Sequence, residues 1–134
     1  MVKIYTYKIE TNSNYLNKIT QQVNEAIEQS NISNGIVTVE AVASSTGILL
    51  IKDDENVLAD VLLESRRLVP ARINYKYQQS PEAAAGNIKA SLFGSSVSMI
   101  VENKQLINSD NKDVYLADYD CPNVREFKVC VMGE

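Results

Sequence analysis

Apolar and polar residues alternate at the start of the chain, which is the period of a strand with one buried face. The alternation covers residues 2–10, a segment rich in β-branched and aromatic residues. Shorter apolar runs predict further strands over residues 36–43, 48–51, 97–101, 114–119 and 125–132. Because both faces of 36–43 carry apolar residues, this strand is expected in the middle of a sheet.

Apolar residues recur at helical spacing in two other segments. The first predicts an amphipathic helix over residues 20–29, with Thr20 as its N-cap. The second predicts a helix that starts at Asn56, its expected cap, and ends before Pro70, whose ring cannot continue it. The residues from 71 to 82 are predicted to form an irregular loop.

A third, short helix is predicted over residues 83–92, and it runs directly into Gly94, Ser95 and Ser96. Gly94 suits the left-handed residue that closes a helix. The two serines either satisfy backbone groups at the join with the next strand, or leave backbone N–H groups free to bind an anion. This join is therefore a candidate binding site.

These elements amount to about six or seven strands and three helices, in an order that does not repeat as βαβ units would. The predicted fold is α+β, a largely antiparallel sheet or sandwich with the helices outside it. The chain has 134 residues and no repeat or linker, so residues 1–134 are expected to form a single domain.

Composition and charge narrow the classes of function. The net charge is −4 and no dense basic cluster stands out, which argues against a nucleic-acid partner. No apolar run approaches the roughly 20 residues of a membrane span, and the N-terminus has no signal-peptide core, so we expect a cytoplasmic protein without a membrane partner. Histidine is absent, which removes the usual general base and the commonest metal ligand; no metal or other cofactor is expected.

The two cysteines, Cys121 and Cys130, fit a reducing compartment. If both lie on one extended segment, about 3.3 Å per residue separates them by about 30 Å. That is too far for a disulfide, so free structural thiols are expected.

Several short motifs occur in order along the chain: Asn34-Gly35-Ile36, Ser45-Thr46, Leu68-Val69-Pro70, residues 88–97, and the spacing of Asp120, Pro122 and Arg125. With these motifs the chain resembles the YjbQ family, whose members are also described as secondary thiamine-phosphate synthases. The resemblance runs essentially from end to end. It implies a compact homotrimer with a YjbQ-like fold and with metal- or phosphate-binding pockets near the subunit boundaries.

The resemblance also implies a changed pocket. Family members place three histidines around it, and the matching positions here are Ser44, about Tyr77, and Asn87. A family glutamate falls at Asp118. A hydroxyl, a phenol and an amide do not titrate near pH 7, so the family chemistry is expected to be lost.

Lys89 matches a family lysine and stands near the Gly94 turn. It either holds a phosphate or carboxylate together with the N–H groups of the turn, or is an exposed lysine on a short helix. The segment from Ser44 to Thr46 is either a polar pocket lip or a bulge between strands.

Other polar groups have two readings as well. Asp118 and Arg125 form either a structural ion pair or a clamp on a ligand. Tyr77 either packs its loop or stacks on the ring of a ligand. The acidic run at residues 53–55 either gathers a hard cation or forms a solvated turn.

The leading hypothesis is a YjbQ-like homotrimer that captures a small anionic ligand electrostatically and does not catalyse the family reaction. Two alternatives stay open. One is weak thiamine-phosphate synthase-like transfer that relies on positioning and charge stabilisation. The other is a structural subunit that completes a site with a histidine-bearing relative. The candidate ligand-binding residues are Ser44, Thr46, Tyr77, Asn87, Lys89, Ser95, Ser96, Asp118 and Arg125.

Overall fold

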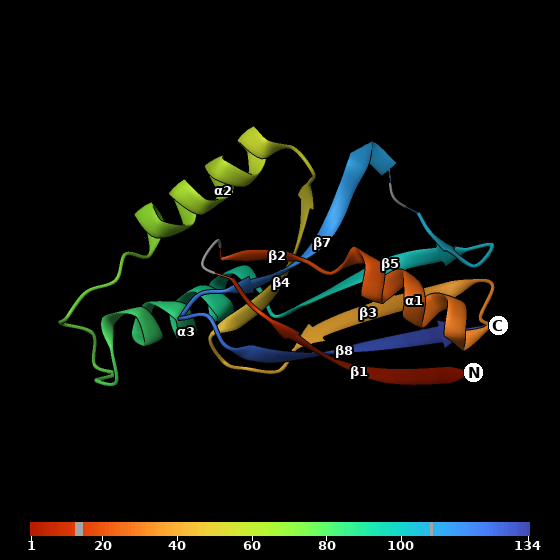
Figure 1. Cartoon of the computed structure of the whole chain (residues 1–134), viewed down its shortest axis with the longest axis horizontal. Helices are drawn as coiled ribbons and strands as arrows, with labels where there is room; N and C mark the ends of the chain where they lie inside the picture. Colours follow the sequence, from red (N-terminus) through yellow and green to blue (C-terminus); the bar gives the residue numbers. More distant parts are fainter. Residues whose placement is uncertain (13–14, 108) are drawn as a thin grey trace.

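Two antiparallel sheets form the framework of the computed structural model, which describes residues 1–12, 15–107 and 109–134. One sheet contains β1 (Val2–Glu10), β3 (Gly35–Ala41), β5 (Ser96–Glu102), β6 (Gln105–Leu106) and β8 (Val124–Gly133). The other contains β2 (Leu16–Lys18), β4 (Thr46–Lys52) and β7 (Lys112–Asp118). Their strand orders are β1-β8-β3-β5-β6 and β2-β7-β4, which confirms the predicted α+β fold with antiparallel sheets (Figure 1).

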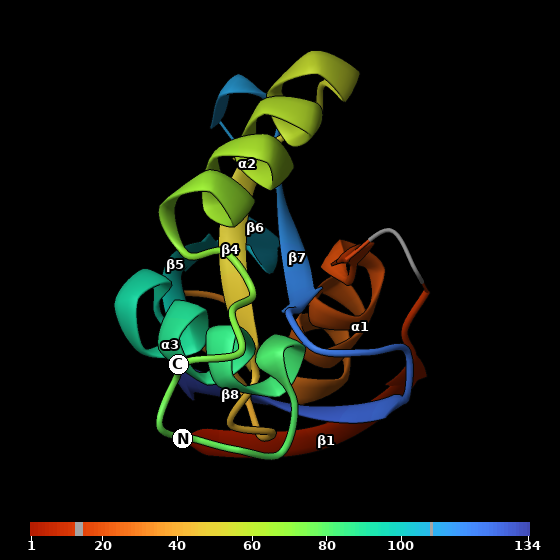
Figure 2. The ribbon, with the colours of Figure 1, turned by 90° about the vertical axis from the view of Figure 1, so that its left-hand side faces the viewer.

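The helices occupy different parts of the molecule. In Figure 1, α1 (Thr20–Ser30) lies at the end that holds both chain termini, and α2 (Glu55–Leu68) and α3 (Pro81–Phe93) lie at the opposite end. Viewed from that opposite end, α2 lies above α3 and in front of β4 (Figure 2). A short 3-10 helix (Ser109–Asn111) precedes β7.

The main core lies between the two sheets and beneath α1. The inner face of α1 packs with alternate residues of β3 and β8 and with one face of β4 and β7. Its fully buried members include Val23, Ile27, Val37, Val39, Ile48, Leu116, Phe127, Val129 and Val131. A second apolar cluster, around Tyr15, Ala90, Ala117 and Tyr119, joins the three-stranded sheet to α2 and α3.

Strand β3 is central, as predicted, because it pairs with β5 on one side and β8 on the other. The pairing aligns four apolar residues of four neighbouring strands in one row across the sheet. All four are about half exposed, on the face opposite the core. We call them the outer row: Val2, Met132, Ile36 and Ile100.

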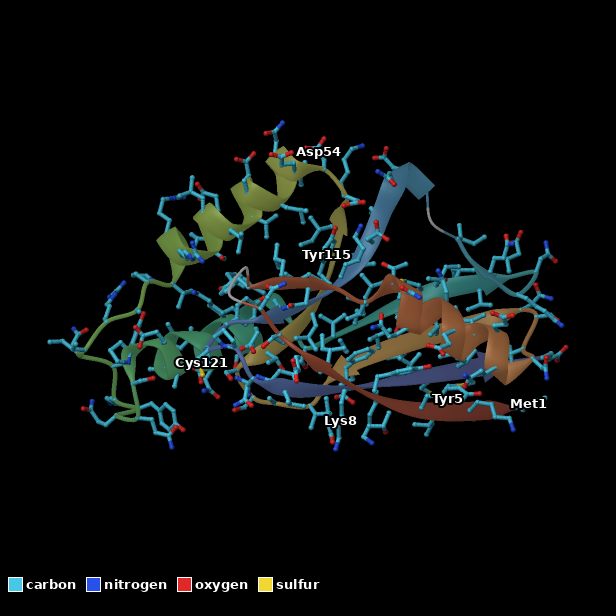
Figure 3. All side chains as sticks on the ribbon, viewed as in Figure 1. Met1, Tyr5, Lys8, Asp54, Tyr115 and Cys121 are labelled. Carbon is cyan, nitrogen blue, oxygen red and sulfur yellow. The ribbon has the colours of Figure 1, made fainter. Side chains whose placement is uncertain are left out.

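The helix starts differ from the sequence predictions. Thr20 does not cap α1: Ile19 occupies the cap position, and the Thr20 hydroxyl accepts a hydrogen bond from Val114 N at 2.9 Å instead. Asn56 does not cap α2, because the Asp54 carboxylate accepts from Asn56 N at 2.8 Å and from Val57 N at 3.2 Å. Figure 3 labels Asp54 at the start of this helix.

The third helix starts earlier than predicted, at Pro81, because Ser80 accepts a hydrogen bond from Ala83 N at 2.9 Å. The loop predicted over residues 71–82 therefore ends at Ser80. Gly94 has a positive φ of 103°, but its ψ of 148° lies outside the left-handed helical region. The short strands β2 and β6 were not predicted.

The segment at Ser44 to Thr46 is not a bulge within one sheet. It is a turn between β3 of the larger sheet and β4 of the smaller one. Both the backbone N–H and the hydroxyl of Thr46 donate to Ala43 O, at 3.1 and 2.7 Å.

Both cysteines are free thiols, as predicted. Cys121 is exposed in the connection between β7 and β8, close to α3 (Figure 3), and Cys130 is partly buried on β8. Each helix in the described part of the chain is too short or too polar to cross a membrane.

Candidate functional site

A glycine sets how closely α3 approaches the sheets. A Cβ atom at Gly86 would lie 3.1 Å from Tyr119 O and 3.2 Å from Ser45 Cβ, so the helix packs almost directly on the residues that follow β7 and precede β4. Lys89 lies about one turn further along α3. The close packing at Gly86 therefore brings Lys89 beside the ring of Tyr119.

Lys89 is a buried cation without a counter-ion among the described residues. Its side chain is 5% exposed. Its ammonium lies 5.2 Å from the centroid of the Tyr15 ring and 5.9 Å from that of Tyr119, within the range of cation–π attraction. Among the described residues, none forms a hydrogen bond or ion pair with its side chain. Buried charges are usually paired, so Lys89 is an exception that calls for an explanation.

A second cation lies near the same ring. The guanidinium carbon of Arg66, on α2, is 5.4 Å from the centroid of Tyr15. Burial, and then the positive charge of Arg66, lower the pKa of Lys89 from its usual value. Arg66 itself is exposed and forms no ion pair with any described residue.

A cavity of about 340 Å³ opens between these two cations. We call it the cationic cavity; its lining includes Tyr15, Arg66, Lys89, Tyr119 and the carboxylate residues Glu82 and Asp120. Neither carboxylate comes within ion-pair distance of Lys89 or Arg66. The volume falls in the range of roughly 300–1,000 Å³ that small-molecule sites occupy. Chemically, the cavity offers two donors of positive charge to an anion.

Asp118 and Arg125 form the predicted ion pair. Arg125 Nε donates to an Asp118 oxygen at 2.8 Å, and the side chains are 12% and 1% exposed. Thr11 donates to the same carboxylate at 2.7 Å. The hydrogen bond with Asp118 raises the pKa of Arg125. The pair ties the end of β7 to the start of β8, and neither member lines the cationic cavity.

Among the described residues, Lys89 is the one sequence-predicted candidate that lines the cationic cavity. Asn87 lies on α3 and donates to Ala83 O within that helix at 2.8 Å. Tyr77 is half exposed in the loop before α3. The remaining candidates lie at the starts of β4 and β5. Ser44 and Ser95 are exposed in the segments before these strands, whereas buried Thr46 and exposed Ser96 are the first strand residues.

The acidic run before α2 has structural partners. Asp53 accepts from Lys18 at 2.8 Å and from the Tyr115 hydroxyl at 3.0 Å, and Asp54 caps the helix. No group of three or more potential metal ligands occurs among residues 1–12, 15–107 and 109–134.

The profile of one protein family, described as "UPF0047 protein YjbQ-like", matches residues 5–134. The chain belongs to this family. A UPF0047 protein of Methanocaldococcus jannaschii is 27% identical over 98% of this chain and 95% of its own length. The UPF0047 protein YugU of Bacillus subtilis is 26% identical over 86% of this chain and 87% of its own length.

Solved structures of the UPF0047 family share the fold. An uncharacterised YjbQ/UPF0047 protein from Clostridium acetobutylicum is 28% identical, with a TM-score of 0.87 over 96% of this chain and 99% of that one. A YbjQ-like protein of unknown function from Sulfolobus solfataricus is similar in fold, with a TM-score of 0.89, 23% identity and complete coverage of both chains. The predicted YjbQ-like fold is thus confirmed, within a family whose described function is unknown.

Proposed function

We propose that this UPF0047 protein binds a small anionic, phosphate-containing ligand between α2 and α3. The observation that carries the proposal is the buried ammonium of Lys89, a residue that lines the cavity together with Arg66. Among the described residues, no carboxylate lies within ion-pair distance of this ammonium. An anion in this cavity would supply the missing counter-charge. Charge-assisted hydrogen bonds to phosphate are among the strong ones in proteins, and arginine provides a two-pronged donor.

We propose further that binding occurs without the thiamine-phosphate synthase-like reaction. The chain has no histidine. Of the phenols beside Lys89, Tyr15 and Tyr119 both have a pKa raised chiefly by burial, so neither is a base near neutral pH. Formation of thiamine phosphate from its pyrimidine and thiazole precursors, above a heat-treated control and lost in Lys89→Met, would contradict this part of the proposal.

A thermal-shift series tests the binding proposal. Inorganic phosphate and simple phosphate esters should raise the melting temperature of the wild-type protein, because a ligand that binds only the folded state stabilises it. Lys89→Met and Arg66→Gln should abolish or strongly reduce this rise. Lys18→Met is the matched control, because Lys18 pairs with Asp53 away from the cavity, and it should keep the rise. A rise that persists in Lys89→Met would refute the proposed site.

We also propose that the protein is a homotrimer, and the outer row supports this assembly. Val2, Met132, Ile36 and Ile100 present a contiguous apolar strip on an uncovered sheet face. Exposed strips of this kind commonly mark protein contacts. Light scattering should give three times the chain mass of 14.9 kDa. Ile36→Glu should lower that mass, and a monomer mass for the wild type at micromolar concentration would contradict the trimer.

A further inference from the structure

A second cavity, of about 350 Å³, lies beside the cationic cavity. We call it the apolar cavity; its walls include Tyr15, Leu49, Val61, Leu68, Phe93 and Tyr119. The two polar residues at its edge already have partners: Glu64 pairs with Arg67, and Ser65 donates to Leu62 O at 2.9 Å. Tyr119 also lines the cavity, and its buried hydroxyl has no hydrogen-bond partner among the described residues. Apart from this hydroxyl, nothing in the lining calls for a polar ligand group.

The two cavities adjoin. Tyr15 and Tyr119 line both of them. One face of α3 also passes from one to the other, since Ala85 and Lys89 line the cationic cavity and Phe93 lines the apolar cavity. Residues spaced in this way lie above one another on a helix. A single small molecule in contact with both linings would therefore have to lie across the tyrosine pair.

The α2 helix covers both cavities with chemically different residues. It contributes Arg66 to the cationic cavity, and Val61 and Leu68 to the apolar cavity. Leu68 is 60% exposed, so the apolar cavity leaves hydrocarbon surface in contact with water. Covering such surface is favourable by roughly 25 cal/mol per Å². A ligand with an apolar group gains this contribution, and a bare inorganic anion does not.

We propose that the ligand is amphiphilic: a phosphate monoester of an aryl or short alkyl group. Its phosphate lies between Lys89 and Arg66, and its apolar group lies in the apolar cavity against Val61 and Phe93. This inference rests on the proposed function, because it requires an anion in the cationic cavity. It adds the class of the ligand, which anion binding alone leaves open.

Isothermal titration with three compounds tests the inference: inorganic phosphate, phenyl phosphate and phenol. Phenyl phosphate should bind the wild-type protein at least roughly tenfold more tightly than inorganic phosphate, from the apolar surface that its ring covers. Phenol should bind far more weakly than phenyl phosphate, because it lacks the charge that Lys89 and Arg66 attract.

Two variants locate the effect. Val61→Asn should remove the advantage of phenyl phosphate and leave the affinity for inorganic phosphate unchanged. Leu63→Asn is the matched control: it introduces the same residue on the same helix, but Leu63 is 63% exposed and lines neither cavity, so the advantage should remain. The wild-type comparison stands even if a variant fails to fold.

The outcomes separate the two proposals. Equal affinity for phenyl phosphate and inorganic phosphate, or an advantage that Val61→Asn leaves intact, overturns the amphiphilic ligand while anion binding survives. Phenol binding as tightly as phenyl phosphate also overturns it. Absence of binding by both phosphates overturns the proposed function and, with it, this inference.

Discussion

Replacing Lys89 by methionine separates a ligand-binding role from a structural one. The substitution keeps an unbranched side chain of similar length and helix propensity, and it removes the positive charge. If Lys89 stabilises the fold, replacing it should lower the free energy of unfolding. If Lys89 is held in place for a ligand, replacing it should raise the free energy of unfolding, because its buried charge has no partner in the described part of the chain.

The size of the effect follows from opposing contributions. Burial of an unpaired ion costs several kcal/mol even after the protein relaxes. The two tyrosine rings near Lys89 offset part of this cost, by roughly 0.5–2 kcal/mol each. Methionine would retain contacts with the same rings, at roughly 0.3–1.5 kcal/mol. We therefore expect Lys89→Met to raise the free energy of unfolding by about 1–2 kcal/mol.

Urea unfolding at pH 7, followed by circular dichroism, measures this change. The urea concentration at the midpoint should shift, while the dependence of the free energy of unfolding on urea concentration stays the same. Lys18→Met is the control, since it breaks a half-exposed ion pair of 2.8 Å with Asp53 and should cost no more than about 1 kcal/mol. Destabilisation by Lys89→Met of more than about 1 kcal/mol would refute the reasoning. Lys89 would then be a structural residue held by the tyrosine rings.

Three further predictions concern the same structure. Burial and the nearby guanidinium lower the pKa of Lys89 in the folded state, so the unfolded state binds the lysine proton more tightly. The free energy of unfolding of the wild type, relative to that of Lys89→Met, should therefore rise as the pH approaches the ordinary lysine pKa of 10.5. Urea titrations over that pH range measure the difference, and a difference that does not change with pH would contradict the prediction. Asp118→Ala should lower the free energy of unfolding by about 3 kcal/mol in the same assay, because the largely buried guanidinium of Arg125 loses its carboxylate and keeps only a hydrogen bond to Cys121 O. The exposed pair of Glu64 and Arg67 should contribute under about 1 kcal/mol, measured with Glu64→Gln, and similar losses in the two variants would count against the Asp118 pair. Asp54→Ala should lower the free energy of unfolding by about 1 kcal/mol, measured by thermal melting, and Asn56→Ala should lower it much less. A larger loss in Asn56→Ala than in Asp54→Ala would disprove the assigned cap.

The larger strands were predictable because one of their faces packs against the core, fully buried in β3 and partly buried in β1. The alternation over residues 2–10 matches β1, and the two-sided apolar pattern of residues 36–43 identifies β3 as central. The strands that were missed, β2 and β6, have three and two residues. Segments this short show no periodicity, and their pairing with β7 and β5 is decided by the neighbouring strand.

Helix caps were less predictable, since several neighbouring residues have capping side chains. Asp54 and Asn56 both suit an N-cap, and the backbone conformation selects Asp54. Thr20 has the right side chain as well, but β7 uses its hydroxyl. Local sequence therefore defines the region of a helix start and not its cap.

The candidate site was predictable only in part. Lys89 could be identified from its place on the third helix and from the family resemblance. Its neighbours Tyr15, Arg66 and Tyr119 come from distant segments, and only the packing of α2 and α3 brings them together. The sequence left Arg125 as either an anion ligand or a partner of Asp118, and the structure shows the pair with Asp118. Spacing along the chain does not reveal which cation already has a carboxylate partner.

The central claim is that an anion binds at the ammonium of Lys89. The most direct measurement is a two-dimensional ¹H–¹³C NMR titration of protein labelled at the lysine ε-carbon, with inorganic phosphate added at constant ionic strength. We predict that one cross-peak, the one absent from Lys89→Met, shifts saturably while the other lysine signals stay in place. Lysine signals that all shift alike, or a Lys89 signal that does not respond, would contradict the account.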